Sequence, residues 1–462
     1  MDELTPLQYH TVVASRLEAL EPRVWGLFRD AARSDGATKP KVDPATPATL
    51  PEDDLEQQLA RHAYRMEPAA HPRVHEAARA AIQALGLEGV PVAIYQLEGG
   101  EGANASLVFR PHEAVLALSG NILALLSDEE LLACFGHELA HHRLWTSDGG
   151  RILVADRILG ALSLDAATPA AYLETARRFD LATELYADRG AFLTCGSVDV
   201  AIGSLVKVAT GLSDVDPQAF LRQAEAARPE RGTAGTTHPE TVLRAWALAR
   251  WHGGDGEAAA ATLLAPSLDI ERLDLVDRER LEGLTRRLVF DVLAVEWMRT
   301  DALVAHARQF LVETAPSAQT GRSGRSRGRP STSEADESPV ETRVADDTPP
   351  ETARFLAYVL LDLGTVDPDL DDESLVEVMA VAREAGLAGA FEEVAKRELE
   401  LSARSWDGLK KRARSRRTAR GSASPTAPEP TAATLPTVAA ESAPAAAASA
   451  GADEAPPPRP AP

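Results

Sequence analysis

The chain has 462 residues, of which 44% are hydrophobic, enough for at least one large core and for two or three domains. It carries 70 acidic and 48 basic residues, which gives a formal net charge of −22 at pH 7. Because a nucleic-acid-binding surface needs an excess of lysine and arginine, this charge argues against general binding of DNA or RNA. With only two cysteines the chain has no disulfide framework, which fits a reducing compartment.

The N-terminal segment, residues 1–54, predicts one or two amphipathic helices up to about residue 33, followed by a linker rich in Pro, Thr and Asp. It begins with acidic residues and lacks the basic start and unbroken apolar stretch of a secretory signal. The best apolar candidate elsewhere, ILVADRILGALSLDAA, contains charged residues and falls short of the roughly 20 apolar residues that cross a bilayer. We therefore expect a soluble, cytoplasmic protein.

Residues 55–252 predict an α+β, mainly helical domain. A helix at about residues 72–87 precedes three apolar segments of strand length, VPVAIYQL, NASLVF and AVLALS, which Gly, Asn and Pro separate. These segments predict a small sheet. The next helix is expected to start at Ser127, because Glu130 three residues later completes a capping box.

That helix contains the sequence HELAH, in which His137 and His141 are four residues apart and Glu138 follows the first histidine. At 3.6 residues per turn both imidazoles project from one face and can bind one cation, with Glu138 about 100° away. A catalytic zinc ion takes three protein ligands and keeps one position open. Because the pentapeptide also arises by chance, the interpretation depends on a third ligand.

A second long helix, predicted at about residues 169–193, supplies a candidate. Glu184 and Asp188, in ELYAD, are also four residues apart and therefore share a face. Glu184 would complete a His, His, Glu ligand set, and Asp188 would accept the free ring N–H of a ligating histidine. The alternative, a helix with two solvated carboxylates, is disfavoured because the neighbouring residues are apolar.

Three segments together resemble a known family: SGNILALLSDEELLACFGHELAHH, ELYAD and THPETVLRAWAL. They are similar, in order and spacing, to the HtpX-like and CAAX-prenyl-protease-like zinc metallopeptidases, metallopeptidase family forty-eight, over about residues 70–252. The third motif of that family is a His-Pro pair with an arginine six residues after the histidine, which His238 and Arg244 reproduce. The resemblance implies a zincin-like fold with accessory helices added to it.

The resemblance also implies a gluzincin site with one Zn²⁺ per chain, held by His137, His141 and Glu184. Glu138 would then be the general base that takes a proton from a zinc-activated water, and would return it to the leaving amine. This predicts a zinc endopeptidase that acts on peptide or protein substrates. The alternative is a catalytically silent zinc-fold protein that serves as a binding or scaffolding module.

Four further residues belong to the predicted site or its surroundings. His238 or Arg244 would donate to the oxyanion that forms on the scissile carbonyl; the alternatives are a structural hydrogen bond for His238 and a carboxylate partner for Arg244. NASLVF is similar to the strand that edges the cleft in this family, so Asn104 and Ala105 would lie beside an extended substrate peptide. A purely structural strand is equally compatible with the sequence. His142 follows the motif but points about 100° away from His141, so a surface position is expected.

The rest of the chain predicts additions to this core. Residues 253–314 predict accessory helices, residues 315–350 a disordered linker, residues 351–412 a small helical module and residues 413–462 a disordered tail. The basic run KKRARSRRTAR is interpreted as the solvated end of a helix. The module or this run is also a candidate for binding a protein partner.

Overall fold

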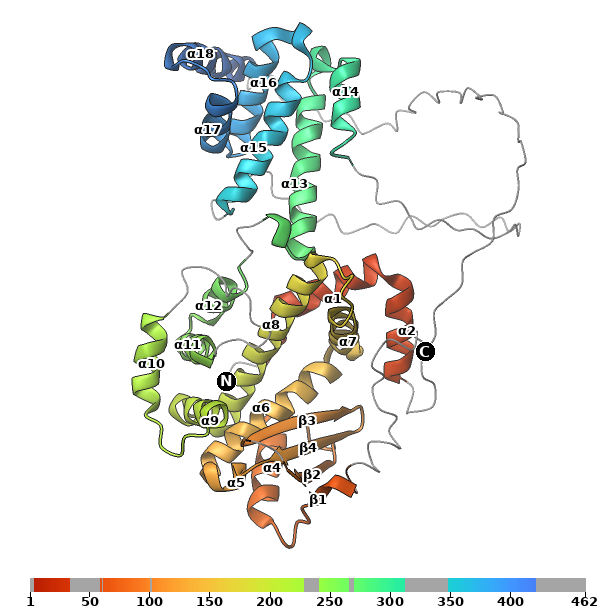
Figure 1. Ribbon diagram of the computed structural model, residues 1–462, viewed down its shortest axis with the longest axis vertical. Helices are drawn as coiled ribbons and strands as arrows, with labels where there is room; N and C mark the ends of the chain where they lie inside the picture. Colours follow the sequence, from red (N-terminus) through yellow and green to blue (C-terminus); the bar gives the residue numbers. More distant parts are fainter. Residues whose placement is uncertain are drawn as a thin grey trace, which may run out of the picture. The chain divides into compact units, whose positions relative to one another are not determined.

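The structure is a computed structural model that describes residues 4–33, 59, 61–99, 102–227, 241–265, 270–311 and 348–420, without the side chains of residues 415–420 (Figure 1). All but the last three residues of the predicted linker, and the predicted tail from residue 421, lie outside the described residues, as does His238. The chain divides after Ala413 into two units, and the elements described below belong to the first, apart from the end of the last helix.

A small mixed sheet contains the three predicted strands and one more. Its strands are β1 (Ala63–Arg65), β2 (Val92–Leu97), β3 (Asn104–Arg110) and β4 (Glu113–Ser119). The order is β1-β2-β4-β3, with β2 and β4 parallel and the other two pairs antiparallel, so β3 forms an edge. The three predicted strands are confirmed. β1 was not predicted, because its three residues carry no apolar alternation.

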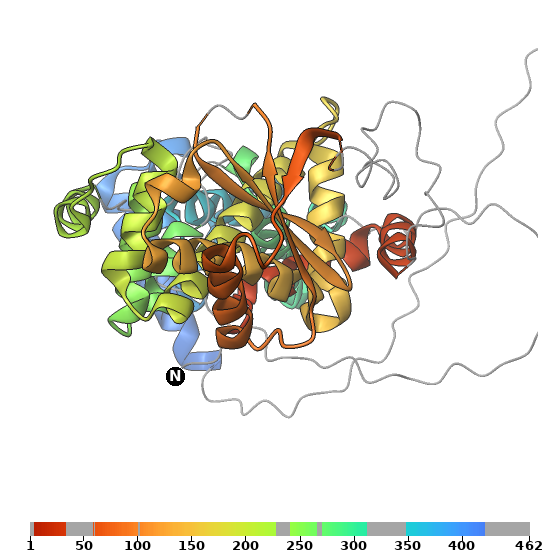
Figure 2. The same cartoon turned by 90° about the horizontal axis from the view of Figure 1, so that it is seen from below.

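Helices cover one face of the sheet. Ile94, Leu116 and Leu118 are buried in the main hydrophobic core together with residues of the helices, whereas Ala93 and Val115 face the other side. In Figure 2 the sheet lies in front of α6 (Asp128–Thr146) and α8 (Ala170–Cys195). These are the two helices that were predicted to carry the site.

The same core includes the N-terminal helices and the helices that connect and follow α6 and α8. These are α1 (Gln8–Leu20), α2 (Pro22–Arg33), α4 (Pro72–Ala84), α5 (Ile122–Leu125), α7 (Arg151–Ser163) and α12 (Gly256–Leu263). A smaller cluster joins α6 and α8 to α9 (Val198–Thr210), α10 (Pro217–Ala226) and α11 (Thr241–His252). The capping box at the start of α6 is present, since the Ser127 hydroxyl accepts from the Glu130 N–H and the Glu130 carboxylate accepts from the Ser127 N–H.

A second hydrophobic core, with Val289, Leu360 and Trp406 among its buried members, holds the later helices together. They are α13 (Leu275–Leu293), α14 (Asp301–Ala307), α15 (Pro350–Thr365), α16 (Asp371–Glu384), α17 (Ala388–Glu398) and α18 (Ala403–Arg420). The division of the chain into domains at the residues given above stays a prediction.

Buried charges connect the start of α13 to α8. Arg178 on α8 is 4% exposed and donates to Asp274 and Asp277, each at 2.5 Å. The Tyr9 hydroxyl, on α1, donates to the same Asp274, also at 2.5 Å. Arg178 lies six residues before Glu184, so this network anchors the helix that supplies the third predicted ligand.

None of the described helices has both the length and the apolar composition to span a membrane.

Candidate metal centre and active site

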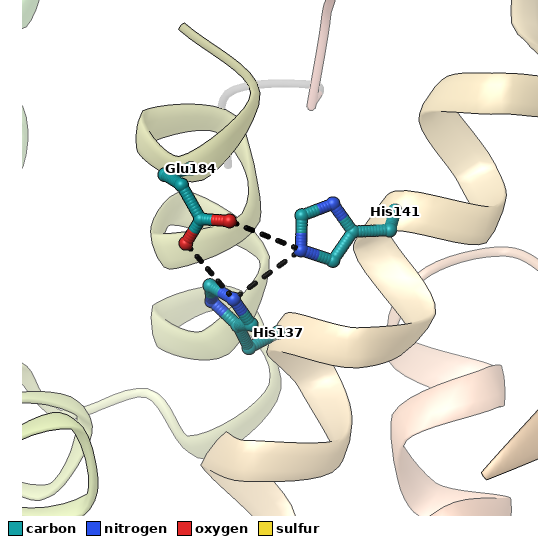
Figure 3. A group of neighbouring side chains, drawn as sticks. All are labelled: His137, His141 and Glu184. Atoms are coloured by element: carbon teal, nitrogen blue, oxygen red, sulfur yellow. Dashed lines mark hydrogen bonds and ion pairs between the residues drawn. The ribbon is translucent and has the colours of Figure 1, made fainter. Parts of the chain in front are cut away.

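The three predicted metal ligands meet between α6 and α8, and their side chains point toward one another (Figure 3). His137 Nε2 lies 3.5 Å from Glu184 Oε2, and His141 Nε2 lies 3.8 Å from Glu184 Oε1. The two Nε2 atoms are 3.3 Å apart. Two nitrogens that each bind zinc at about 2.0–2.1 Å in tetrahedral geometry are about 3.3–3.4 Å apart, so this spacing fits a shared zinc ion.

The short distance between the ligands depends on close packing of the two helices. A Cβ on Gly190 of α8 would lie 2.4 Å from the Cβ of Ala140 on α6, and 3.0 Å from the Gly136 carbonyl oxygen. A larger residue at position 190 would therefore force the helices apart. Because Ala140 precedes His141 directly, the absence of a side chain on Gly190 brings the histidine and glutamate ligands within reach of one ion.

A network of charged groups surrounds the ligands. The Asp188 carboxylate, one turn after Glu184, lies 3.1 Å from His137 Nδ1. Arg244 of α11 donates to both oxygens of Asp188, at 2.8 and 2.6 Å, and lies 2.9 Å from Glu184 Oε2. One guanidinium thus bridges the two carboxylates that share a face of α8.

This network sets the protonation of the ligands. Burial is the largest single influence and would raise the pKa of Glu184, but the charge of Arg244 and the interactions with the two histidine ligands together outweigh it and hold that pKa well below its usual range. For His137, burial lowers the pKa, but the hydrogen bonds with Asp188 and Glu184 and the negative charges of these two groups outweigh burial and raise the pKa to about 10. The site therefore favours positive charge at His137, and the same electrostatics favours a bound metal cation.

The comparison with protein families gives one match. The sequence model of Peptidase family M48 matches residues 68–252, a range that contains every strand after β1, both helices of the metal site and Arg244. Residues 68–252 are a Peptidase family M48 domain. Its His, His, Glu site is a zinc site, and the domain is a zinc metallopeptidase domain. The comparison with curated proteins and the comparison with solved structures each gave no match.

Glu138 lies on α6 of the M48 domain beside the metal ligands and is half-buried. Its carboxylate interacts with the backbone of Leu107 on β3. Burial, the largest influence, raises the pKa of Glu138 to about 7, although the positive charge of His137 opposes the rise. A carboxyl group with a pKa near neutrality is suited to accept and release a proton.

The remaining predicted residues of the M48 domain are placed as follows. Asn104 and Ala105 begin β3, with Asn104 exposed and Ala105 buried. The sequence predicted a surface position for His142, and this prediction is wrong, because His142 is only 1% exposed. Its Nε2 lies 3.1 Å from the Arg110 carbonyl oxygen, because β3 covers the side of α6 from which it projects.

One side chain beside the M48 metal site was not singled out from the sequence. Trp145 follows His141 by four residues, and its ring stacks on the imidazole with centroids 5.4 Å apart and planes 27° apart. The signal that could have found it is the helical spacing, which places residues i and i+4 on one face. The predicted motifs ended at His142, so the continuation of that face was overlooked.

Proposed function

We propose that the M48 domain is an endopeptidase that cleaves internal bonds of peptide or protein substrates, with Glu138 as the general base. The observation that carries this proposal is the convergence of His137, His141 and Glu184 next to an intact Glu138. When bound, zinc polarises the scissile carbonyl and makes an attacking water more acidic. Glu138 accepts the proton of that water and then delivers it to the leaving amine, a task that its pKa of about 7 supports.

We propose that the open edge of β3 binds the substrate as an added strand. The backbone of Leu107 interacts with the Glu138 carboxylate, which supports main-chain groups at this residue that point away from β4. In a β-strand the main-chain groups of alternate residues point to the same side, so those of Ala105 share this direction with those of Leu107. An extended peptide paired at Ala105 would pass close to Glu138, and the exposed Asn104 side chain would flank it.

Asp188 and Arg244 are proposed as positioning residues. Asp188 would keep His137 in the tautomer that leaves Nε2 free for zinc, which the 3.1 Å contact with Nδ1 supports. Arg244 already uses its donors on two carboxylates, which favours a role in holding Glu184 and Asp188 over donation to an oxyanion. The oxyanion role of His238 stays a prediction.

Two broader predictions complete the proposal. A reducing location such as the cytoplasm is supported by Cys134 and Cys195, both of which are free thiols outside any disulfide. A protein partner for the C-terminal helical module or for the basic run at Lys410 to Arg420 stays a prediction from the sequence.

The experiment uses an internally quenched peptide that is blocked at both ends, so that only endopeptidase cleavage releases fluorescence. Wild-type full-length protein and Glu138→Gln are compared after zinc content has been measured for both. We expect the wild type to cleave the peptide, and Glu138→Gln to keep its zinc and lose at least about 100-fold in rate, the usual contribution of a general base. Cleavage by Glu138→Gln at the wild-type rate would exclude the proposed base, and a wild type that binds zinc but cleaves nothing would favour the silent binding module.

A further inference from the structure

The two histidine ligands are held in different ways. His137 has its second ring nitrogen, Nδ1, 3.1 Å from the Asp188 carboxylate. The Nδ1 of His141 is also buried, but among the residues that the structure describes it has no hydrogen-bond partner. Histidines that bind metal usually donate this second ring N–H to a carboxylate or carbonyl, which fixes the ring orientation. His141 therefore needs another contact to hold its ring.

The face of Trp145 provides such a contact. The indole stacks on the His141 imidazole at 5.4 Å with an interplanar angle of 27°, within the range of favourable offset stacking. Trp145 is in turn held by Phe109 of β3, whose ring meets it edge to face at 5.5 Å and 83°. The indole thus lies between the edge strand and the ligand.

We propose that Trp145 is a positioning residue for the zinc site, and that stacking on its indole orients His141 as the Asp188 contact orients His137. The torsion that rotates an imidazole about its Cβ–Cγ bond has a broad energy profile, so a ring without a hydrogen bond turns easily. The indole face blocks this rotation and keeps Nε2 directed at His137 Nε2 and Glu184. The inference rests on the zinc site and not on the proposed role of Glu138.

The indole N–H makes the ring contact easy to separate from hydrogen bonding. Trp145 Nε1 is buried and has no hydrogen-bond partner among the described residues. Replacing Trp145 by Phe keeps an aromatic face beside His141 and removes a donor that makes no bond. Replacing it by Met keeps an apolar side chain of good helix propensity but removes the ring.

The test measures zinc affinity of the full-length chain by competition with a chromophoric chelator, and the visible absorption of the cobalt(II)-substituted protein, which reports ligand geometry. We expect Trp145→Met to weaken zinc binding about 10-fold and to change the cobalt spectrum, as losses of contacts that orient ligands do. Trp145→Phe should resemble the wild type in both. The matched control is Trp25→Leu, which removes a buried tryptophan of the same core on α2, away from the site.

Three results would overturn the proposal. The first is unchanged zinc affinity and an unchanged cobalt spectrum in Trp145→Met. The second is an equal loss in Trp25→Leu, which would indicate a general effect of lost core packing. The third is an equal loss in Trp145→Phe, which would show that an aromatic face is not what His141 needs. If Trp145→Met does not fold, Phe109→Leu replaces it, with a smaller loss of zinc affinity expected and an unchanged affinity contradicting the proposal.

Discussion

Replacing Arg244 by methionine tests the charge network that holds the zinc ligands. The side chain of Arg244 is 14% exposed and that of Asp188 is 5% exposed, so their ion pair is largely shielded from water. The variant would leave Asp188 and Glu184, which share one face of α8, without the guanidinium that bridges them. Breaking a buried pair on one side costs about 3–5 kcal/mol, because a charge is left buried and unpaired. We expect the free energy of unfolding to fall by that amount.

The pH dependence of this loss follows from the two carboxyl groups. Burial would raise the pKa of Glu184 and of Asp188, but the charge of Arg244 and the interactions of both carboxylates with His137 together outweigh burial and lower both. Groups whose folded pKa is lowered stabilise the fold above their unfolded pKa of about 4, and this contribution disappears as the pH falls through the folded pKa. Without Arg244, the largest influence that opposes burial is lost, so the pair is protonated more easily. The deficit of the variant should therefore be largest near pH 7 and smaller near pH 5.

The assay is urea unfolding of the full-length protein in the presence of a metal chelator, at both pH values. The matched control is Arg250→Met on the same helix, whose side chain is 37% exposed and pairs with Glu225 at 2.7 Å. A pair of this kind contributes about 0–1 kcal/mol. The reasoning is refuted if Arg244→Met costs no more than Arg250→Met. Adding Asp188→Asn to Arg244→Met should recover part of the loss, since it removes one unpaired charge.

Three further predictions concern the surroundings of the site. Burial lowers the pKa of His10 to about 3, so the stability that the neutral imidazole contributes should be lost as the pH falls below about 6.5, the pKa of an unfolded histidine. In urea unfolding, the wild type should lose about 2 kcal/mol more than His10→Leu between pH 7 and pH 5. Gly190→Ala should lower the free energy of unfolding by about 1–3 kcal/mol and weaken zinc binding. The control is Gly160→Ala, where an added Cβ meets nothing within 4 Å and the fold should gain up to about 1 kcal/mol. Equal effects of the two variants would contradict the close packing of α6 and α8. Arg178→Met should lower the free energy of unfolding in urea by about 3–5 kcal/mol, because it leaves two aspartates without their buried partner. A loss below about 1 kcal/mol would mean that these two ion pairs stabilise the fold no more than surface pairs do.

The metal ligands could be predicted because helical geometry is local. HELAH and ELYAD each place two side chains on one face, and this periodicity holds whatever surrounds the helices. The capping box that starts α6 is equally local, and it was found where the sequence placed it. The zinc ligand set followed once two such faces had been identified.

Features that depend on contacts between distant segments could not be predicted. His142 is buried because β3, 32 residues earlier in the chain, covers it, and its polar neighbours gave no sign of this. Arg178 meets Asp274 across 96 residues, a pairing that no spacing rule indicates. β1 is a strand because it pairs with β2, since three residues contain too little pattern to predict one.

The central claim, a zinc peptidase site made by His137, His141 and Glu184, is tested most directly by one comparison. Zinc content and casein hydrolysis are measured together on the wild type and on Glu184→Gln, whose side chain has nearly the same shape but no charge. We predict about one zinc per chain and hydrolysis for the wild type, and a loss of both for Glu184→Gln. Full zinc content and full hydrolysis in Glu184→Gln would contradict the account.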